Sequence, residues 1–372
     1  MSEHPTRRSA STALALGLSA LAYPLAAGAK ATGVAQNPGR AWTRFAAPEF
    51  AGFSSARLAK VEQSFYDKPT TSVMIVKAGK VVYTYGEPAQ VSYLASARKS
   101  VLSMLYGNYV AKGVIKLDAT LADIGINEGG AGLTAQERSA TVRDILTASS
   151  GVYWPPDTPG SGPDSPARGA FKPGTHFYYN NWDFNVAGAI FEKLTGKTVF
   201  KALEQDLAIP LGFEDFDIHR QRMLGLAGDP SRYKAYHLFL SGRDMARLGV
   251  CMAHGGRWNE RQVVPAAWVR DSTALHVKGA DTGRNGEVGY GYLWWKPSES
   301  RKGPEWVDSF QASGQFGQYI LGLPAIDTVI VHRRAVTDQY ALARNLGKTE
   351  VRPAGDEIDF LPIADAILAA RI

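Results

Sequence analysis

Two predicted β-hairpins near opposite ends of the 372-residue chain constrain its fold more than any other feature. Residues 72–85 contain two β-rich runs joined by Lys-Ala-Gly-Lys, and residues 319–332 contain two more joined by Pro-Ala-Ile-Asp. The pattern between the hairpins is mainly helical. We therefore expect an α+β fold with a central antiparallel sheet built from both chain ends. We also expect helices flanking the sheet and an inserted, mainly helical lobe at about residues 112–280.

Two helices are predicted beside this sheet. Residues 54–65 begin with two serines suited to helix capping and carry Leu58, Val61 and Phe65 on one face. The last ten residues, 363–372, are predicted to form a closing helix. A chain of 372 residues suits one two-lobed unit or two domains, and we expect the folded domain to span residues 48–372.

The N-terminal residues are typical of a targeting segment. Arg7 and Arg8 precede an apolar run at residues 12–27, and small residues suited to cleavage follow. We expect a signal peptide at residues 1–29, with cleavage as late as about residue 35, and a protein that is periplasmic or secreted. The paired arginines leave both the general secretory route and the twin-arginine route open.

Composition excludes several classes of function. Hydrophobic residues make up 45% of the chain and charged residues 20%, as in ordinary soluble globular proteins. The net charge of +6 is spread out, without a basic run interleaved with aromatics, so we expect no nucleic-acid partner. Cys251 is the single cysteine, and the seven histidines lack metal-ligand spacing. We expect no metal and no cofactor.

The run Ser96-Ala-Arg-Lys99 opens a predicted helix with a regular apolar stripe. A serine and a lysine three residues apart share one face of a helix. A buried lysine can accept the serine proton, and a serine in the first turn directs its own N–H toward an oxyanion. Ser96 and Lys99 are therefore a candidate nucleophile and base. Ser100 is the rival serine, and we expect Arg98 to face solvent or to be paired.

A second motif, Tyr179-Asn-Asn181, enters a helix predicted at residues 183–194. The tyrosine can carry a proton to a leaving group, and the asparagine can hold a substrate carbonyl. Tyr178 is a rival phenol and Asn180 a rival amide. On its own the motif fits an ordinary turn equally well.

A third segment, residues 310–319, carries Gly314 and Gly317 immediately before a predicted strand. Glycine there lets a ligand approach the backbone closely, and a backbone N–H can complete an oxyanion hole with Ser96. A loop that merely turns the chain is the alternative.

The long Pro/Gly-rich loop at residues 154–174 precedes the second motif, and loops of this length are often functional. We expect it to cover the site, with Tyr153 and Trp154 at its start and Trp182 opposite. Such an aromatic rim would suit an apolar acyl group or a linear amide. Ordinary packing is the alternative for each ring.

The three motifs in this order resemble those of the penicillin-recognising serine hydrolases. These comprise class C β-lactamases, D,D-peptidases, related serine esterases and 6-aminohexanoate-dimer hydrolase. The resemblance runs from about residue 72 to residue 334. Further segments are similar to the same family, namely residues 141–151, 241–249, 255–258 and 289–295. The resemblance implies a β-lactamase/transpeptidase-like fold and a serine hydrolase of the esterase or amidase type.

The resemblance also implies residue roles. Ser96 would be the nucleophile, Lys99 its base partner and Tyr179 the second base or acid. Asn181 would be the substrate-side amide, and the oxyanion N–H groups would come from Ser96 and Gln315. The other residues expected on the substrate side are Gly314, Trp182 and Tyr153.

One departure from the family pattern bears on the substrate. Ala312-Ser313-Gly314 stands where the family has a lysine or histidine strand motif, so any replacement cation would come from elsewhere, with Arg333 or Arg334 as candidates. The 6-aminohexanoate-dimer hydrolases resemble this chain in the segment from Gly314 to Gln318. The expected substrate is a small ester, amide or peptide. A D,D-peptidase, a weak β-lactamase and an inactive peptidoglycan- or partner-binding relative are the alternatives.

Overall fold

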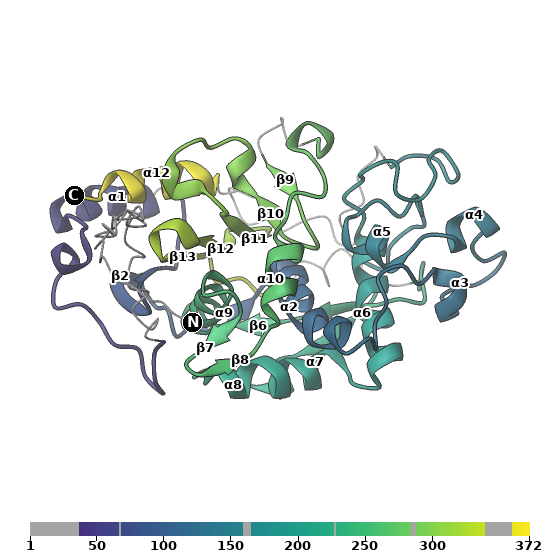
Figure 1. Ribbon diagram of the computed structural model, residues 1–372, viewed down its shortest axis with the longest axis horizontal. Helices are drawn as coiled ribbons and strands as arrows, with labels where there is room; N and C mark the ends of the chain where they lie inside the picture. The colour runs from purple at the N-terminus through teal and green to yellow at the C-terminus, as the bar shows by residue number, and fades with distance from the viewer. Residues whose placement is uncertain (1–36, 67, 159–164, 227, 284–287, 339–358) are drawn as a thin grey trace, which may run out of the picture. The chain divides into compact units, whose positions relative to one another are not determined.

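A seven-stranded antiparallel sheet joins the two ends of the chain, in the order β2-β1-β13-β12-β11-β10-β9 (Figure 1). β1 pairs with β13 along its length, from Ser72 opposite Arg333 to Lys77 opposite Thr328. Both predicted hairpins and the expected α+β architecture are therefore confirmed. The strands are β1 (Ser72–Lys77), β2 (Lys80–Gly86), β9 (Gly289–Tyr290), β10 (Trp295–Lys296), β11 (Phe310–Gly314), β12 (Gln318–Leu323) and β13 (Thr328–Arg333).

The computed structural model describes residues 37–66, 68–158, 165–226, 228–283, 288–338 and 359–372. The predicted signal peptide lies outside these residues. Within them, no helix is both long enough and apolar enough to cross a membrane.

Local backbone chemistry accounts for the first hairpin. Ala78 and Gly79 both adopt positive φ, 48° and 71°, between β1 and β2. Two consecutive left-handed residues match the twist of the flanking strands in a tight hairpin. Glycine adopts this left-handed conformation without strain, and here it occupies the second of the two central turn positions.

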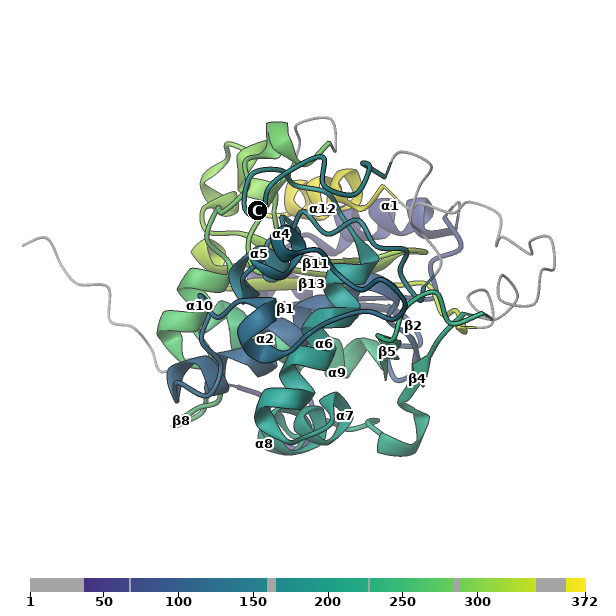
Figure 2. The same cartoon turned by 90° about the vertical axis from the view of Figure 1, so that its right-hand side faces the viewer.

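Helices cover both faces of the sheet. Figure 2 shows α1 (Ser55–Tyr66) and α12 (Phe360–Ala369) above the strands and α9 (Gly242–Ala253) below them. On the upper face, the Tyr319 and Phe360 rings stack at 4.5 Å between centroids. On the lower face, a Cβ at Gly249 would lie 2.6 Å from the Val329 side chain, so only glycine lets α9 pack this closely. α12 begins before the closing helix predicted at residues 363–372.

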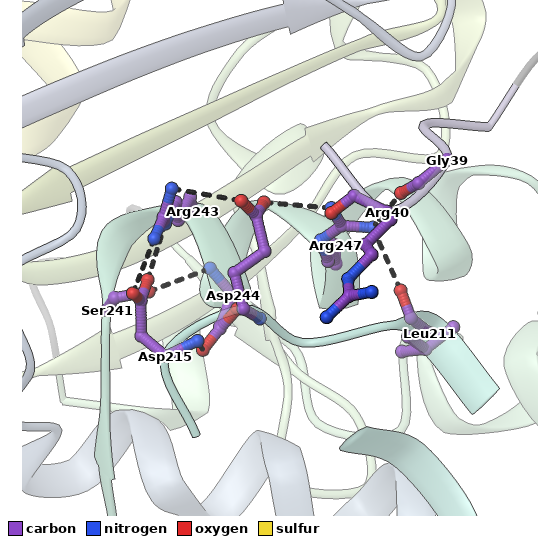
Figure 3. Close-up of polar contacts among 9 residues, drawn as sticks. Gly39, Arg40, Leu211, Asp215, Ser241, Arg243, Asp244 and Arg247 are labelled. Carbon is purple, nitrogen blue, oxygen red and sulfur yellow. Dashed lines mark hydrogen bonds and ion pairs between the residues drawn. The ribbon is translucent and has the colours of Figure 1, made fainter. Parts of the chain in front are cut away.

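A polar network anchors α9 at its N-terminal end (Figure 3). The Arg243 guanidinium contacts both Asp215 oxygens at 2.5 and 2.6 Å, and Arg247 reaches the carbonyl oxygens of Gly39 and Leu211 at 3.0 Å each. The Asp244 carboxylate accepts the backbone N–H of Asp215 at 3.1 Å. Burial raises the pKa of Asp244 to about 6. This network secures the helix that supports the lower face of the sheet.

The remaining helices and three small two-stranded sheets lie between the hairpins in sequence. Three short helices begin with a complete capping box, at Thr120, Thr134 and Thr141. The helices are α2 (Arg98–Ala111), α3 (Leu121–Ile124), α4 (Ala135–Arg138), α5 (Val142–Leu146), α6 (Asn181–Thr195), α7 (Val199–Ala202), α8 (Ile209–Leu211) and α10 (Ala266–Ser272). The small sheets pair β3 (Ser92–Tyr93) with β6 (Phe239–Leu240), β4 (Arg222–Leu224) with β5 (Ala235–His237), and β7 (Arg257–Trp258) with β8 (Arg261–Gln262).

α2 and α6 carry the first two sequence motifs. α6 begins at Asn181, two residues before the predicted start, because the Asn180 side chain caps it by accepting the Trp182 N–H at 3.1 Å. Gly196 ends it in the left-handed conformation. The Asn180 cap defines where α6 begins, so Asn181 lies in its first turn.

Candidate active site

Ser96 lies in a 3₁₀ turn, Ala95–Ala97, that leads directly into α2. Ala95 adopts a φ of 47°, a left-handed conformation that costs a non-glycine residue about 1 kcal/mol or more. A Cβ at Gly314 would lie 2.3 Å from the Leu94 carbonyl oxygen and 2.9 Å from the Ala97 nitrogen. The end of β11 therefore packs directly against the Ser96 turn, and glycine is required for that approach.

The Lys99 ammonium group joins the first two motifs. Its Nζ lies 2.8 Å from Ser96 Oγ, 2.7 Å from the Tyr179 hydroxyl and 3.0 Å from Asn181 Oδ1. Ser96 and Lys99 share a helix face as their spacing predicts, while Tyr179 and Asn181 reach them from the start of α6. The structure thus brings these four predicted residues together around one nitrogen atom.

Lys99 is almost completely buried, with 1% of its surface exposed. Its Nζ lies 4.3 Å from the Tyr179 ring centroid and 4.2 Å from that of Phe184. The Tyr179 ring in turn stacks on Trp295 at 5.5 Å. Removal from water disfavours the charged form of an amine, so this enclosure favours a lysine that can accept a proton. Ser96 itself is only partly buried.

The rival residues are occupied elsewhere. Ser100 is buried and its hydroxyl donates to the Leu293 carbonyl at 2.7 Å. Asn180 caps α6 and donates from Nδ2 to the Val152 carbonyl at 2.6 Å. The Tyr178 ring packs edge-on against Tyr153. The contacts of Lys99 therefore favour Ser96, Tyr179 and Asn181 over their sequence neighbours.

Gly314 and Gln315 lie where β11 ends beside the Ser96 turn. Gly314 is buried, whereas Gln315 is exposed in the turn between β11 and β12. Phe316 and Gly317 in this turn both have positive φ, 69° and 94°. Because Gly314 packs against Leu94 and Ala97, the backbone at the start of this turn lies next to the Ser96 turn.

Two predicted substrate contacts are positioned differently from expectation. Trp182 is fully buried, and its Nε1 donates to Glu128 Oε1 at 2.6 Å, so it does not form part of an exposed rim. Residues 181 and 182 project about 100° apart on a helix, so Trp182 turns into the core when Asn181 faces Lys99. Tyr153 is also buried, and burial raises the pKa of its phenol to about 12.

The loop at residues 154–174 is only partly described. Trp154 Nε1 donates to the Pro230 carbonyl at 2.9 Å, and the Arg168 guanidinium lies 4.6 Å from the Trp154 ring centroid. Arg168 also pairs with the buried carboxylate of Glu137. These contacts fasten both described ends of the loop to the protein. Its predicted role in covering the site stays a prediction.

The sequence interpretation missed Phe184 and Trp295, which enclose Lys99 and Tyr179. Phe184 follows Asn181 by three residues on α6, so the helical period could have indicated it. Trp295 belongs to the family-like phrase at residues 289–295 and reaches the site through β10. Tyr290 on β9 packs edge-on against Trp295, at 4.7 Å between centroids. Together these rings form an aromatic wall behind Tyr179.

A buried acid, Asp183, precedes Phe184 on α6. Burial raises the pKa of the Asp183 carboxyl well above its usual value, even though the Ser150 hydroxyl donates to it at 2.6 Å. Among the described residues, no group of three or more His, Cys, Asp or Glu side chains is arranged to hold a metal ion.

Comparison with known proteins identifies the family. A family model described as Beta-lactamase matches residues 58–338. The chain belongs to the β-lactamase family. No curated protein matches its sequence significantly. The predicted resemblance to this serine hydrolase superfamily is therefore confirmed.

Solved structures share the fold at low sequence identity. A Bacillus anthracis protein assigned as a 6-aminohexanoate-dimer hydrolase matches with a TM-score of 0.61 and 17% identity, over 90% of this chain and 88% of its own. A Bacteroides dorei protein assigned as a β-lactamase matches with a TM-score of 0.63 and 18% identity, over 86% and 99%. EstCE1, a hydrolase with promiscuous acyltransferase activity, matches with a TM-score of 0.58 and 15% identity, over 84% and 98%. At such identities these matches establish the fold of this β-lactamase-family chain and no more.

Proposed function

We propose that the protein cleaves an ester or an amide through a covalent acyl-serine intermediate formed at Ser96. The observation that carries this proposal is the position of Lys99 Nζ, within hydrogen-bonding distance of both Ser96 Oγ and the Tyr179 hydroxyl. A nucleophile, a proton acceptor and a second proton carrier in direct contact are the minimum that acyl transfer to serine requires.

Acylation begins when Lys99, in its neutral form, takes the proton of the Ser96 hydroxyl. Oγ then attacks the substrate carbonyl carbon, and the carbonyl oxygen becomes an oxyanion beside the backbone N–H groups of Ser96 and Gln315. When the tetrahedral intermediate collapses, the bond to the leaving oxygen or nitrogen breaks. Tyr179 gives that atom a proton and recovers one from Lys99.

Deacylation reverses these roles with water in place of the leaving group. The Lys99–Tyr179 pair takes a proton from water, hydroxide adds to the acyl carbon, and the Ser96 Oγ–carbon bond breaks. The proton returns to Ser96, and a carboxylic acid leaves. Asn181 accepts a hydrogen bond from the Lys99 amine through Oδ1 at 3.0 Å, which positions the base beside Ser96 during both steps.

The enclosing rings favour a substrate with an uncharged, apolar acyl group. Tyr179, Phe184 and Trp295 surround the reacting groups, and β11 carries no charged residue between Phe310 and Gly314. A charged substrate group would lose its water beside such apolar surroundings without gaining an opposite charge on β11, which costs free energy. Simple esters and linear amides fit this description better than anionic substrates.

The proposal is tested with a fluorophosphonate probe and a substrate panel. An active serine hydrolase should be labelled at Ser96, as located by peptide mass spectrometry, and should turn over some members of a series of p-nitrophenyl esters and linear amides. A Ser96→Ala variant serves as the control. A folded wild-type protein that is neither labelled nor active would instead support an inactive, ligand-holding relative.

We also propose that the protein acts in the periplasm or outside the cell. This proposal rests on the charge and hydropathy pattern of residues 1–29. Protein recovered from an extracytoplasmic fraction should begin between about Lys30 and Gln36. An intact Met1 on active, exported protein would overturn the prediction of a cleaved signal peptide, and active protein found only in the cytoplasm would overturn the proposed location.

A further inference from the structure

Arg98, inside the Ser96–Lys99 motif, is a buried cation that the proposed mechanism does not use. Only 2% of its surface is exposed, so of the two expectations for this residue, facing solvent or being paired, the first is wrong. It is the first residue of α2, directly before Lys99. A guanidinium keeps its proton at any working pH, so this position carries a fixed positive charge.

The contacts of Arg98 hold this charge in one place. Its NH2 group donates to Asn185 Oδ1 at 3.2 Å, and its guanidinium carbon lies 4.7 Å from the Tyr236 ring centroid. The Asn185 amide is itself oriented, because its Nδ2 donates to Thr158 Oγ1 at 3.0 Å and to the Tyr233 carbonyl at 3.1 Å. Arg98 thus links the start of α2 to α6 through neutral partners only.

No carboxylate balances this charge directly. Among the residues that the structure describes, Arg98 makes no ion pair, and its buried Nε lacks a hydrogen-bond partner. Asp338 acts on the same two groups as Arg98, Tyr93 and His237, but it forms a two-point ion pair with Arg222 and a contact of 3.1 Å with His237 Nδ1. The carboxylate of Asp338 is therefore paired with another arginine.

The charge of Arg98 acts on the titratable groups around it. Burial raises the pKa of Tyr93 to about 12, and Arg98 opposes this rise. Burial lowers the pKa of His237, with Asp338 opposing and Arg98 adding to the change. Burial also raises the pKa of Tyr236. The charge of Arg98 lowers this pKa, and Tyr179 raises it.

The contacts with α6 place Arg98 close to the base: Asn185, which accepts from Arg98, follows Asn181, which accepts from Lys99, by four residues. The two cationic side chains therefore contact neighbouring positions on one face of α6, one turn apart.

We propose that Arg98 is an electrostatic positioning residue whose fixed charge lowers the pH at which the Lys99–Tyr179 pair gives up a proton. The pair shares a hydrogen bond of 2.7 Å, so its protons are lost in steps that belong to the pair rather than to either residue. A nearby positive charge opposes the most protonated form of the pair, whichever atom holds the proton. This inference rests on the proposed function, because it concerns the base of that reaction.

Arg98 therefore makes the reactive form of the pair available at a lower pH. A fixed charge on a neighbouring residue in a protein interior shifts a titration by about one pH unit. Without it, the acidic limb of the pH–rate profile would lie about one unit higher, and the rate well below that limb would fall about tenfold. A purely structural role would change the amount of folded protein and leave the limb in place.

The test uses the pH dependence of the rate at which a fluorophosphonate labels Ser96, which needs no knowledge of the substrate. Arg98→Met removes the charge and keeps similar length, and we expect its acidic limb to move up by about one unit. Arg98→Lys keeps the charge and should restore the wild-type limb. Asn185→Ala removes the tether but not the charge, so it should lower thermal stability without moving the limb.

Asn185→Asp provides a second route to the same question if Arg98→Met does not fold. The new carboxylate would pair with the Arg98 guanidinium and cancel its charge. We expect the acidic limb of the pH–rate profile to move up as in Arg98→Met. The inference would be overturned if the acidic limb stayed at the wild-type pH in folded Arg98→Met or Asn185→Asp. It would also be overturned if Arg98→Lys or Asn185→Ala moved the limb as far as Arg98→Met does. Absence of Ser96 labelling in the wild-type protein would contradict the proposed function itself, so the two failures are distinguishable.

Discussion

The buried imidazole of His332 on β13 holds the turn between β11 and β12 through Gly317. His332 Nδ1 lies 2.8 Å from the Gly317 carbonyl oxygen and therefore donates to it, while the Thr70 hydroxyl lies 2.8 Å from Nε2. Gln318 makes a second contact that fixes the turn, because its Nε2 donates to the Arg334 carbonyl at 2.6 Å. These side chains fix the turn whose backbone lies beside Ser96.

Loosening this turn should reduce catalysis more than binding. His332→Leu removes the donor to Gly317, and we expect kcat to fall about tenfold or more with a small change in KM, because an oxyanion donor acts mainly in the transition state. His332→Asn places an amide N–H near the position of Nδ1 and should recover much of the loss. Equal kcat values for the two variants, at matched folded fractions, would contradict a positioning role for His332.

The same histidine should make stability depend on pH. Burial lowers the pKa of His332 to about 4, from 6.5 for a solvent-exposed imidazole. The unfolded chain therefore binds a proton below about pH 6.5 while the folded protein does not, so the free energy of unfolding falls from pH 6.5 toward pH 4. Denaturant titrations across this range should show a smaller fall for His332→Asn than for the wild-type protein. An identical slope in both would exclude His332 as the source.

The choice between the two serines of the motif is testable by matched substitutions. Ser96→Ala should abolish covalent labelling and reduce turnover by about 10⁴-fold while leaving the fold intact. Ser100→Ala should keep activity and lose about 1 kcal/mol of stability, because it leaves the buried Leu293 carbonyl without its hydroxyl donor. Steady-state rates and thermal unfolding of both variants check this. An inactive, well-folded Ser100→Ala protein would reverse the assignment.

The role of Lys99 predicts a specific failure of the arginine variant. In Lys99→Arg the positive charge remains, but a guanidinium cannot accept the Ser96 proton, so we expect a loss of about 10³-fold in labelling rate and turnover. The wild-type rate should rise with pH as the Lys99–Tyr179 pair loses a proton. Lys99→Met separates loss of the base from the effect of a misplaced charge. Substantial activity in Lys99→Arg would exclude lysine as the proton acceptor.

Local rules predicted those parts of the fold and site that depend on neighbouring residues. Helix geometry alone puts Lys99 one turn from Ser96, and turn chemistry alone closes the hairpin at Ala78 and Gly79. The contact between Lys99 and Tyr179 spans 80 residues and followed only from the resemblance to a known family. No local pattern indicates that pairing of distant segments.

The errors have a similar origin. Trp182 was expected at a rim opposite the start of the 154–174 loop, but it is fully buried and its indole donates to Glu128. For Arg98 the solvent-facing alternative was wrong: the side chain is buried and donates to Asn185 from another helix. Burial of polar side chains is decided by partners that the sequence places far away, so hydropathy alone cannot predict it.

The last prediction concerns β-lactams. β-Lactam binding in this family is expected to use a cation or hydroxyl-rich edge at the strand motif, where this chain has Ala312-Ser313-Gly314. Arg333, one candidate replacement, is fully buried and donates to the Leu240 carbonyl at 3.1 Å, so it does not supply that charge. Losing one charge-assisted hydrogen bond costs about 1.5–3 kcal/mol, or roughly ten- to a hundredfold in affinity.

We therefore expect slow acylation of Ser96 by penicillins, poor turnover of nitrocefin and faster turnover of p-nitrophenyl acetate. Intact-mass spectrometry after incubation with a penicillin measures the acyl-enzyme, and Ser96→Ala shows whether any adduct is at that serine. Ser313→Lys introduces a cation on β11 as a matched gain-of-charge variant, and penicillin acylation should rise about tenfold if the missing charge limits binding. Nitrocefin turnover far faster than ester turnover in the wild-type protein would contradict the preference for uncharged esters and amides, since no charge on β11 would then be needed to hold the β-lactam carboxylate.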